Sequence, residues 1–184
     1  MISPDWKILK SAFVADLKIF KARFDYLLNP HTQKKIKVTV LEANDAVNVI
    51  ALNNKGDIAL VRQFRFGSQE YSLEIPGGFM EDGEEPLEAV QRELKEETGL
   101  TSTRWEPLGT IFSNPVYQSA KIHHFVAYDV LRSEETSFDD EEFLSLSFYS
   151  PAELKQAFDD DLITHPHTIS ALCRLYNVFD AKSI

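Results

Sequence analysis

Residues 78–100 read GFMEDGEEPLEAVQRELKEETGL. Pro86 suits the first position of a helix and Gly99 suits a C-terminal stop, so this stretch predicts a helix over 86–98. The apolar positions of the helix fall within about a 60° arc, at about 100° per residue, and predict its core-facing side: Leu87, Val90 and Leu94.

Three carboxylates lie beside that apolar stripe, within about a 100° arc: Glu93, Glu96 and Glu97. Like charges three and four residues apart destabilise a helix unless something positive compensates them. Oxygen ligands gathered in this way suit Mg²⁺ or Mn²⁺. Upstream, Gly77 and Gly78 offer a bare backbone that can approach a phosphate or lend a carbonyl to a metal. The alternative from spacing alone is an exposed, Glu-rich helix.

The spacing of these residues resembles a known family pattern. It runs Gly78, five residues, Glu84, seven residues, Arg92-Glu93-Leu94, one residue, Glu96-Glu97, one residue, Gly99-Leu100, and is similar to the complete Nudix box. The resemblance implies a Mg²⁺-dependent hydrolase (Mn²⁺ being a second option) that cleaves a nucleoside diphosphate linked to another group. It also implies an α+β fold, the Nudix α/β/α sandwich.

By the same resemblance, the box positions receive roles. The implied metal ligands are Glu93, Glu96, Glu97 and the main-chain carbonyl of Gly77. Arg92 and Glu84 correspond to a structural pair that orients the helix against the loop before it. Two or three Mg²⁺ ions are the family expectation.

A second resemblance narrows the substrate class. Residues 61–65 (VRQFR), ahead of 73–78 (LEIPGG), are similar to the ADP-ribose and ADP-sugar pyrophosphatases. Arginine binds a diphosphate well because its fork bonds two oxygens. Arg62 and Arg65 differ by an odd number of strand positions, so only one of them points into a site, and Arg65 is preferred. The alternative is that both are surface arginines.

Downstream marks point in two directions. Pro115 lies where the ADP-ribose subgroup has a proline, and Tyr117 lies where dinucleoside polyphosphate hydrolases have a tyrosine. The general base of the ADP-ribose subgroup is often a loop carboxylate, which here selects Glu141. The neighbouring acids Asp139, Asp140 and Glu142 stay open, as does a base drawn from the box glutamates. A Nudix-like sensor that binds a nucleotide sugar without cleaving it is the non-enzymatic alternative.

Alternating and β-branched runs predict strands on both sides of the helix. A first hairpin is predicted from 17–28 and 35–41, and a second from 46–52 and 57–64. Further strands are expected near 104–112, 121–131 and 143–149, followed by helices from Pro151 and over 167–179. Residues 1–45 are expected to form an N-terminal antiparallel β extension that serves in homodimerisation, and 46–184 the catalytic domain.

Composition excludes several classes. The chain has 184 residues and a net charge of −10, from 29 acids and 19 bases. That balance disfavours nucleic acid and anionic membranes as partners and leaves a small nucleoside diphosphate sugar as the expected substrate. A single cysteine, Cys173, allows no internal disulfide. No signal-peptide pattern or apolar run of membrane-spanning length is present, so a cytoplasmic location is expected.

Overall fold

The computed structural model describes residues 5–133 and 145–176. The chain divides into two compact units. The first contains Met1–Asn44 with Phe112–Lys121, and the second contains Asp45–Ile111 with Ile122–Ile184. Residues Phe112–Lys121 thus join the first unit, although they lie within the segment expected to form the catalytic domain.

The first unit contains a three-stranded antiparallel sheet in the order β1-β2-β3, with β1 at Lys7–Asp16, β2 at Lys21–Leu28 and β3 at Lys35–Glu42. The predicted first hairpin, β2 with β3, is confirmed. Its turn is organised by Asn29, whose Oδ1 accepts hydrogen bonds from the backbone N–H groups of His31 at 2.9 Å and Thr32 at 3.1 Å. Strand β1 lies within the predicted N-terminal β extension, but it was not predicted as a separate strand because its polar and apolar residues do not alternate.

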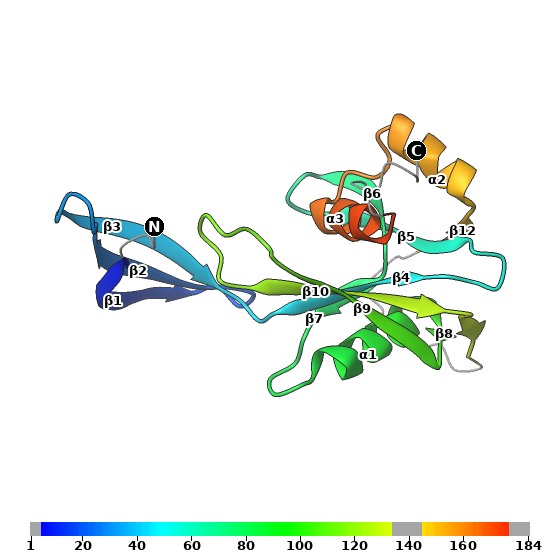
Figure 1. Ribbon diagram of the computed structural model, residues 1–184, viewed down its shortest axis with the longest axis horizontal. Helices are drawn as coiled ribbons and strands as arrows, with labels where there is room; N and C mark the ends of the chain where they lie inside the picture. The colour runs from blue at the N-terminus through cyan, green and yellow to red at the C-terminus, as the bar shows by residue number, and fades with distance from the viewer. Residues whose placement is uncertain (1–4, 134–144, 177–184) are drawn as a thin grey trace. The chain divides into compact units, whose positions relative to one another are not determined.

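The second unit holds the remaining elements (Figure 1). One sheet has the order β7-β4-β10-β9, another β12-β5-β6, and a third pairs β11 with β8. The strands are β4 Ala46–Ala51, β5 Ile58–Arg65, β6 Glu70–Glu74, β7 Gly77–Phe79, β8 Leu100–Thr101, β9 Arg104–Phe112, β10 Lys121–Tyr128, β11 Leu131–Arg132 and β12 Ser145–Tyr149. The helices are α1 Pro86–Thr98, α2 Pro151–Asp159 and α3 Pro166–Leu175.

The predicted second hairpin is wrong. Its two strands exist as β4 and β5, but they belong to different sheets and meet only at an isolated bridge between Leu52 and Ile58. Strand β4 instead pairs in parallel with β10 and antiparallel with β7. Both strands are apolar along most of their length, so their pattern does not distinguish one neighbour from another.

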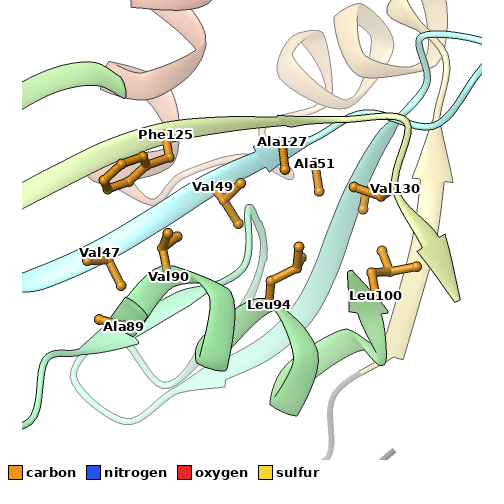
Figure 2. Close-up of a cluster of buried hydrophobic side chains, with 11 residues drawn as sticks. Val47, Val49, Ala51, Ala89, Val90, Leu94, Leu100, Phe125, Ala127 and Val130 are labelled. Atoms are coloured by element: carbon orange, nitrogen blue, oxygen red, sulfur yellow. The ribbon is translucent and has the colours of Figure 1, made fainter. Parts of the chain in front are cut away.

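Strand β4 is buried on both faces because helices cover both sides of its sheet (Figure 1). Val47, Val49 and Ala51 pack with Val90 and Leu94 of α1. Figure 2 shows this cluster, with α1 lying along the strands that it covers. From the opposite face, Ile50 joins a second cluster that includes residues of α2 and α3. The result is the expected α/β/α arrangement.

Helix α1 begins and ends where predicted. Pro86 occupies its first turn, and Gly99 adopts a left-handed conformation (φ 67°) with its N–H bonded to the Lys95 carbonyl at 2.8 Å. The expected core-facing stripe is correct for Val90 and Leu94, but Leu87 is 43% exposed. Ala89 is buried instead, and it packs in the same cluster as Val90 and Leu94. The buried face of α1 therefore includes Ala89 and not Leu87.

A buried polar network ties α3 to the sheet. His124 of β10 is 1% exposed, and its Nδ1 lies 2.6 Å from Asn48 Oδ1 of β4. Its Nε2 lies 2.9 Å from Ser170 Oγ of α3. Burial lowers the pKa of His124 to about 4, with smaller contributions from Arg174 and neighbouring histidines. The imidazole is therefore neutral in the folded protein at neutral pH. No helix in the described part of the chain is long and apolar enough to cross a membrane.

We predict acid destabilisation through His124. Below about pH 6.5 the unfolded chain binds a proton that the folded state refuses until about pH 4, so the free energy of unfolding falls across that window. His124→Gln should reduce the loss between pH 7 and 4.5 by about 1–3 kcal/mol. Urea unfolding at several pH values measures this. His31→Gln, in the exposed β2–β3 turn, is the control, and an unchanged pH slope for His124→Gln would contradict the prediction.

Candidate active site

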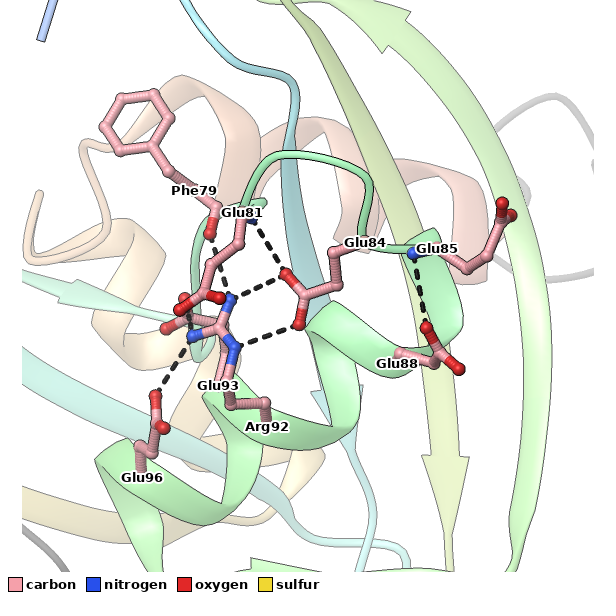
Figure 3. A network of polar contacts seen from close by, with 8 residues as sticks. All are labelled: Phe79, Glu81, Glu84, Glu85, Glu88, Arg92, Glu93 and Glu96. Carbon is pink, nitrogen blue, oxygen red and sulfur yellow. Dashed lines mark hydrogen bonds and ion pairs between the residues drawn. The ribbon is translucent and has the colours of Figure 1, made fainter.

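Arg92 of α1 fixes the loop that precedes its own helix (Figure 3). Its Nε and Nη2 donate to the two carboxylate oxygens of Glu84 at 3.0 and 2.9 Å, and Nη2 also donates to the Phe79 carbonyl at 3.1 Å. Glu84 in turn accepts a hydrogen bond from the Glu81 N–H at 2.9 Å. The hydrogen bond from Arg92 is the main cause that lowers the pKa of Glu84. The predicted Arg92–Glu84 pair is therefore present in the structure.

The other side of the same guanidinium meets two box carboxylates. Arg92 Nη1 lies 2.7 Å from Glu93 Oε1 and 3.0 Å from Glu96 Oε2. The hydrogen bond to Glu84 is the main cause that raises the pKa of Arg92 above its usual range. The hydrogen bonds to Glu93 and Glu96 and the charge of Glu93 raise it further. One fixed positive charge thus compensates the like charges that the sequence placed along this face of α1.

Glu97 faces the strand before the loop. Its side chain is buried, and its Oε2 accepts a hydrogen bond from the backbone N–H of Gly77 at 2.9 Å. Gly77 itself pairs with Asn48 of β4 so closely that a Cβ there would overlap the Val47 carbonyl oxygen. The hydrogen bond from the Gly77 N–H therefore holds the carboxylate of Glu97 against strand β7.

Gly78 makes room for Glu93. A Cβ at position 78 would lie 2.5 Å from Glu93 Oε2 and 2.6 Å from Oε1. The bare backbone therefore forms one wall of the space that this carboxylate occupies. Glu93, Glu96 and Glu97 all come from one face of α1, whereas Gly77 and Gly78 come from β7, which pairs with β4.

The donor set suits a hard divalent cation, because it consists of carboxylate oxygens beside a bare glycine backbone. Among residues 5–133 and 145–176, no group of three or more His, Cys, Asp or Glu side chains is arranged to hold a metal ion. Arg92 Nη1 contacts both Glu93 and Glu96 in this arrangement. In chemistry these residues suit a divalent cation, and the guanidinium of Arg92 lies against Glu93 and Glu96.

The two candidate arginines of β5 contact different residues. Arg65 donates from Nε and Nη2 to Glu74 of β6 at 2.9 and 2.5 Å. Arg62 places its guanidinium 3.8 Å from the ring centroid of Tyr71. In the sheet register Arg62 is opposite Leu73, whereas Glu74, the partner of Arg65, is opposite Val61. Residues 61 and 65 lie on one face of β5 and Arg62 lies on the other. The two arginines therefore use opposite faces of the strand, as their odd spacing predicts.

A family model for the NUDIX domain matches residues 43–170. The chain belongs to the Nudix family. An ADP-ribose pyrophosphatase of Bacillus subtilis (strain 168) is 32% identical over 114 residues, which is 61% of this chain and 62% of the relative. The ADP compounds hydrolase NudE of Escherichia coli (strain K12) is 30% identical, over 62% of this chain and 61% of its own. The chain thus matches less than two thirds of either relative.

Other similarities are more extensive or concern the fold. A methanol dehydrogenase activator of Bacillus methanolicus is 29% identical over 167 residues, which is 90% of both chains. The crystal structure of an ADP compounds hydrolase superposes with a TM-score of 0.84, covering 97% of this chain and 96% of the other at 23% identity. That likeness establishes the Nudix fold for this chain.

The general base predicted for this Nudix protein, Glu141, lies outside the described residues, as do Asp139, Asp140 and Glu142. Its role stays a prediction. Pro115 and Tyr117, the two conflicting subgroup marks, belong to the first unit, where the Tyr117 carbonyl accepts a hydrogen bond from the Leu41 N–H at 2.7 Å. This main-chain contact does not distinguish the two marks.

Two polar residues near Arg65 were not predicted. Glu74 is a buried carboxylate between the apolar residues Leu73 and Ile75, and such an acid in an apolar strand signals a paired charge. His165, the residue before α3, has its Nδ1 3.4 Å from Glu74 Oε2. No pattern in the sequence links His165 to Glu74, because 91 residues separate them.

Alanine substitutions at the two glycines before α1, Gly77 and Gly78, should have contrasting effects. The three atoms nearest to a Cβ at Gly78 all belong to the end of the flexible Glu93 side chain, so in Gly78→Ala the fold should persist while the carboxylate moves. Hydrolytic activity should fall roughly tenfold or more, as for residues that orient metal ligands. Gly77→Ala meets the backbone of β4 and should lower the melting temperature instead.

Thermal melts and turnover of both variants measure the contrast, with Gly67→Ala as control, since a Cβ at Gly67 meets nothing within 4 Å. Full activity in Gly78→Ala would show that the space it leaves for Glu93 is not needed.

Proposed function

We propose that the protein hydrolyses the diphosphate bond of ADP-ribose or a related nucleoside diphosphate sugar, releasing a nucleoside monophosphate and a sugar phosphate. The observation that carries the proposal is the set of carboxylates on α1, Glu93, Glu96 and Glu97, gathered beside Gly77 and Gly78. The names of the B. subtilis and E. coli relatives support the substrate class.

Mg²⁺, with Mn²⁺ as a substitute, is the cofactor we propose. Glu93, Glu96, Glu97 and the carbonyl of Gly77 would hold it. When bound, such a cation polarises a diphosphate and lowers the pKa of a coordinated water. Arg92 keeps the loop of Glu84 against α1 through Nε and Nη2, and this bond is separate from its contacts with Glu93 and Glu96.

Arg65 is the residue we propose for binding the diphosphate. Its side chain is 40% exposed while that of Glu74 is 2% exposed, so the guanidinium is the outer member of the pair and the one that a dissolved anion meets. Arg62, stacked on Tyr71, is the secondary candidate on the opposite strand face. Glu141 is proposed to take the proton from the attacking water.

A dinucleoside polyphosphate hydrolase is the second candidate, and Tyr117 favours it, since its position after the box matches that group. Both candidates cleave a phosphoanhydride bond, so they are distinguished by which substrate the protein prefers.

The test is a substrate panel: ADP-ribose, other nucleoside diphosphate sugars and diadenosine polyphosphates, each with Mg²⁺ and with EDTA. We expect the highest kcat/KM for ADP-ribose or another nucleoside diphosphate sugar, and no turnover in EDTA. Glu97→Gln keeps an acceptor for the Gly77 N–H but loses a carboxylate, and should lower kcat by roughly 10²-fold. Undiminished turnover in EDTA, or preference for diadenosine polyphosphates, would contradict the proposal.

A homodimer formed through the N-terminal extension, residues 1–45, is part of the proposal. Strand β1 is an edge of its sheet, and edge strands readily pair with a second chain. Large apolar side chains on and beside it are exposed in the single chain: Trp6, Ile8, Leu9, Phe13 and Val14. Several exposed large apolar side chains along one edge strand support an interface there.

Light scattering of the full chain tests the dimer. We expect a mass about twice 21.0 kDa, and a shift toward the monomer for Phe13→Glu, because Phe13 is 69% exposed and a charge there opposes burial. Thr32→Glu, in the exposed β2–β3 turn, should stay dimeric. A monomeric wild type would remove dimerisation from the proposal.

A further inference from the structure

Glu74 of β6 is a carboxylate within an apolar stretch, and its side chain is only 2% exposed. A buried carboxylate is tolerated when it is paired and hydrogen-bonded. The guanidinium of Arg65 meets both conditions, with Nε 2.9 Å from Oε1 and Nη2 2.5 Å from Oε2. Each carboxylate oxygen thus accepts its own hydrogen bond. This is the fork geometry that fixes a guanidinium in place and in rotation.

The backbone that carries Glu74 is held firmly. Leu73 and Ile75, on either side of it, are buried in the core. Their main-chain N–H groups donate to residues 162–168, at 2.9 and 3.2 Å. Arg65, in contrast, is the last residue of β5, and its side chain is 40% exposed. Of the two partners, Glu74 is therefore the fixed one and Arg65 is the one whose direction is set.

Arg65 lies on the side of β5 that faces helix α1. Ala59 of the same strand packs in one cluster with Val90 of α1, and alternate residues of a strand share a face, so Arg65 follows Ala59. Ile58 belongs to the other cluster, with α2 and α3, and Arg62 follows Ile58. Of the two candidate arginines, Arg65 is thus the one on the side of the helix that bears the box carboxylates.

The chain between Glu74 and Gly77 connects this arginine to the box. Three residue steps span at most about 11 Å of extended chain. The N–H of Gly77 donates to Glu97 Oε2 at 2.9 Å. One short segment therefore holds Arg65 through Glu74 and holds Glu97 through Gly77, so that both are anchored to the same piece of main chain.

We propose that Glu74 is a positioning residue for diphosphate binding: it aims the guanidinium of Arg65. The inference rests on the proposed function, in which Arg65 binds the diphosphate. Glu74 is too deeply buried to touch a substrate and acts only through Arg65. The fork engages two of the five N–H donors of the guanidinium, and because the group is planar, this fixes the directions of all five.

The charge of Glu74 acts against its geometry. A carboxylate beside Arg65 offsets the attraction of the guanidinium for a diphosphate, so loss of that charge alone would strengthen binding. The effect is small for a side chain as exposed as Arg65, because water screens it. Loss of the fork instead releases a long side chain with many rotamers, which a diphosphate must order again when it binds. We therefore expect orientation to outweigh charge, and the sign of the change in KM distinguishes them.

Glu74→Gln tests the idea. Gln keeps the shape and one acceptor oxygen, but its amide N–H groups face the guanidinium donors and break the fork. It leaves no unpaired buried charge, so the fold should persist. We expect KM for ADP-ribose to rise about tenfold with kcat nearly unchanged, as for the loss of one hydrogen bond to a charged group. A fall in KM, an unchanged KM, or a loss confined to kcat would overturn the proposal.

A second background shows whether Glu74 acts through Arg65. Arg65→Lys keeps a positive charge beside Glu74 but cannot form the fork. In this background Glu74→Gln should raise KM no further, because the two residues act in series. Asp129→Asn is the control: it removes the partner of another arginine, Arg104, at 2.6 Å on the exposed surface, and should leave KM at the wild-type value. A tenfold rise in the Arg65→Lys background, or an equal rise in Asp129→Asn, would contradict the positioning role.

Affinity for inorganic pyrophosphate, measured by calorimetry, reads the Arg65 contact without turnover. Weaker pyrophosphate binding in Glu74→Gln but not in Asp129→Asn, in a protein that hydrolyses no nucleoside diphosphate sugar, would leave the positioning role standing while the proposed function fails. An active wild type whose KM and pyrophosphate affinity are both unaltered in Glu74→Gln would reject the positioning role and leave the proposed function standing.

Discussion

The guanidinium of Arg92 is the contact on which the candidate site depends. With Nε and Nη2 it holds Glu84 and the Phe79 carbonyl, and with Nη1 it meets Glu93 and Glu96. Without this cation, Glu84, Glu93 and Glu96 would lose the charge-assisted hydrogen bonds that offset the repulsion among them. A planar, permanently charged group with donors in fixed directions suits the task better than lysine, which is a point charge on a flexible stem.

The sheet determines the position of helix α1. Strand β4 is buried on both faces, so it receives α1 on one side and the α2–α3 layer on the other. Its partner β7 contributes Gly77 and Gly78, which bring bare backbone against Glu97 and Glu93. Packing, backbone approach and charge compensation therefore meet at one short segment. A side chain at Gly77 would disturb the pairing with β4, whereas a side chain at Gly78 would displace the Glu93 carboxylate.

Helix α1 was predictable from the sequence because its signals are local. Pro86, Gly99 and the apolar stripe lie within one stretch of chain, and the spacing of the box acids follows from the helical repeat alone. The pairing of β4 was not predictable, because an apolar strand accepts any neighbour and the choice of β10 depends on residues far along the chain. The same limit applies to His165 and Glu74, which only the folded chain brings together.

The central claim is that the carboxylates of α1 form a site for a divalent cation beside the guanidinium of Arg92. Binding of Mn²⁺ to the full chain, followed by electron paramagnetic resonance, tests this most directly. We expect saturable binding that Mg²⁺ competes away and that Glu93→Gln combined with Glu97→Gln abolishes. Glu88→Gln, on the same helix and compatible with its capping box, should bind as the wild type does. Equal binding in the double variant, or none in the wild type, would contradict the account.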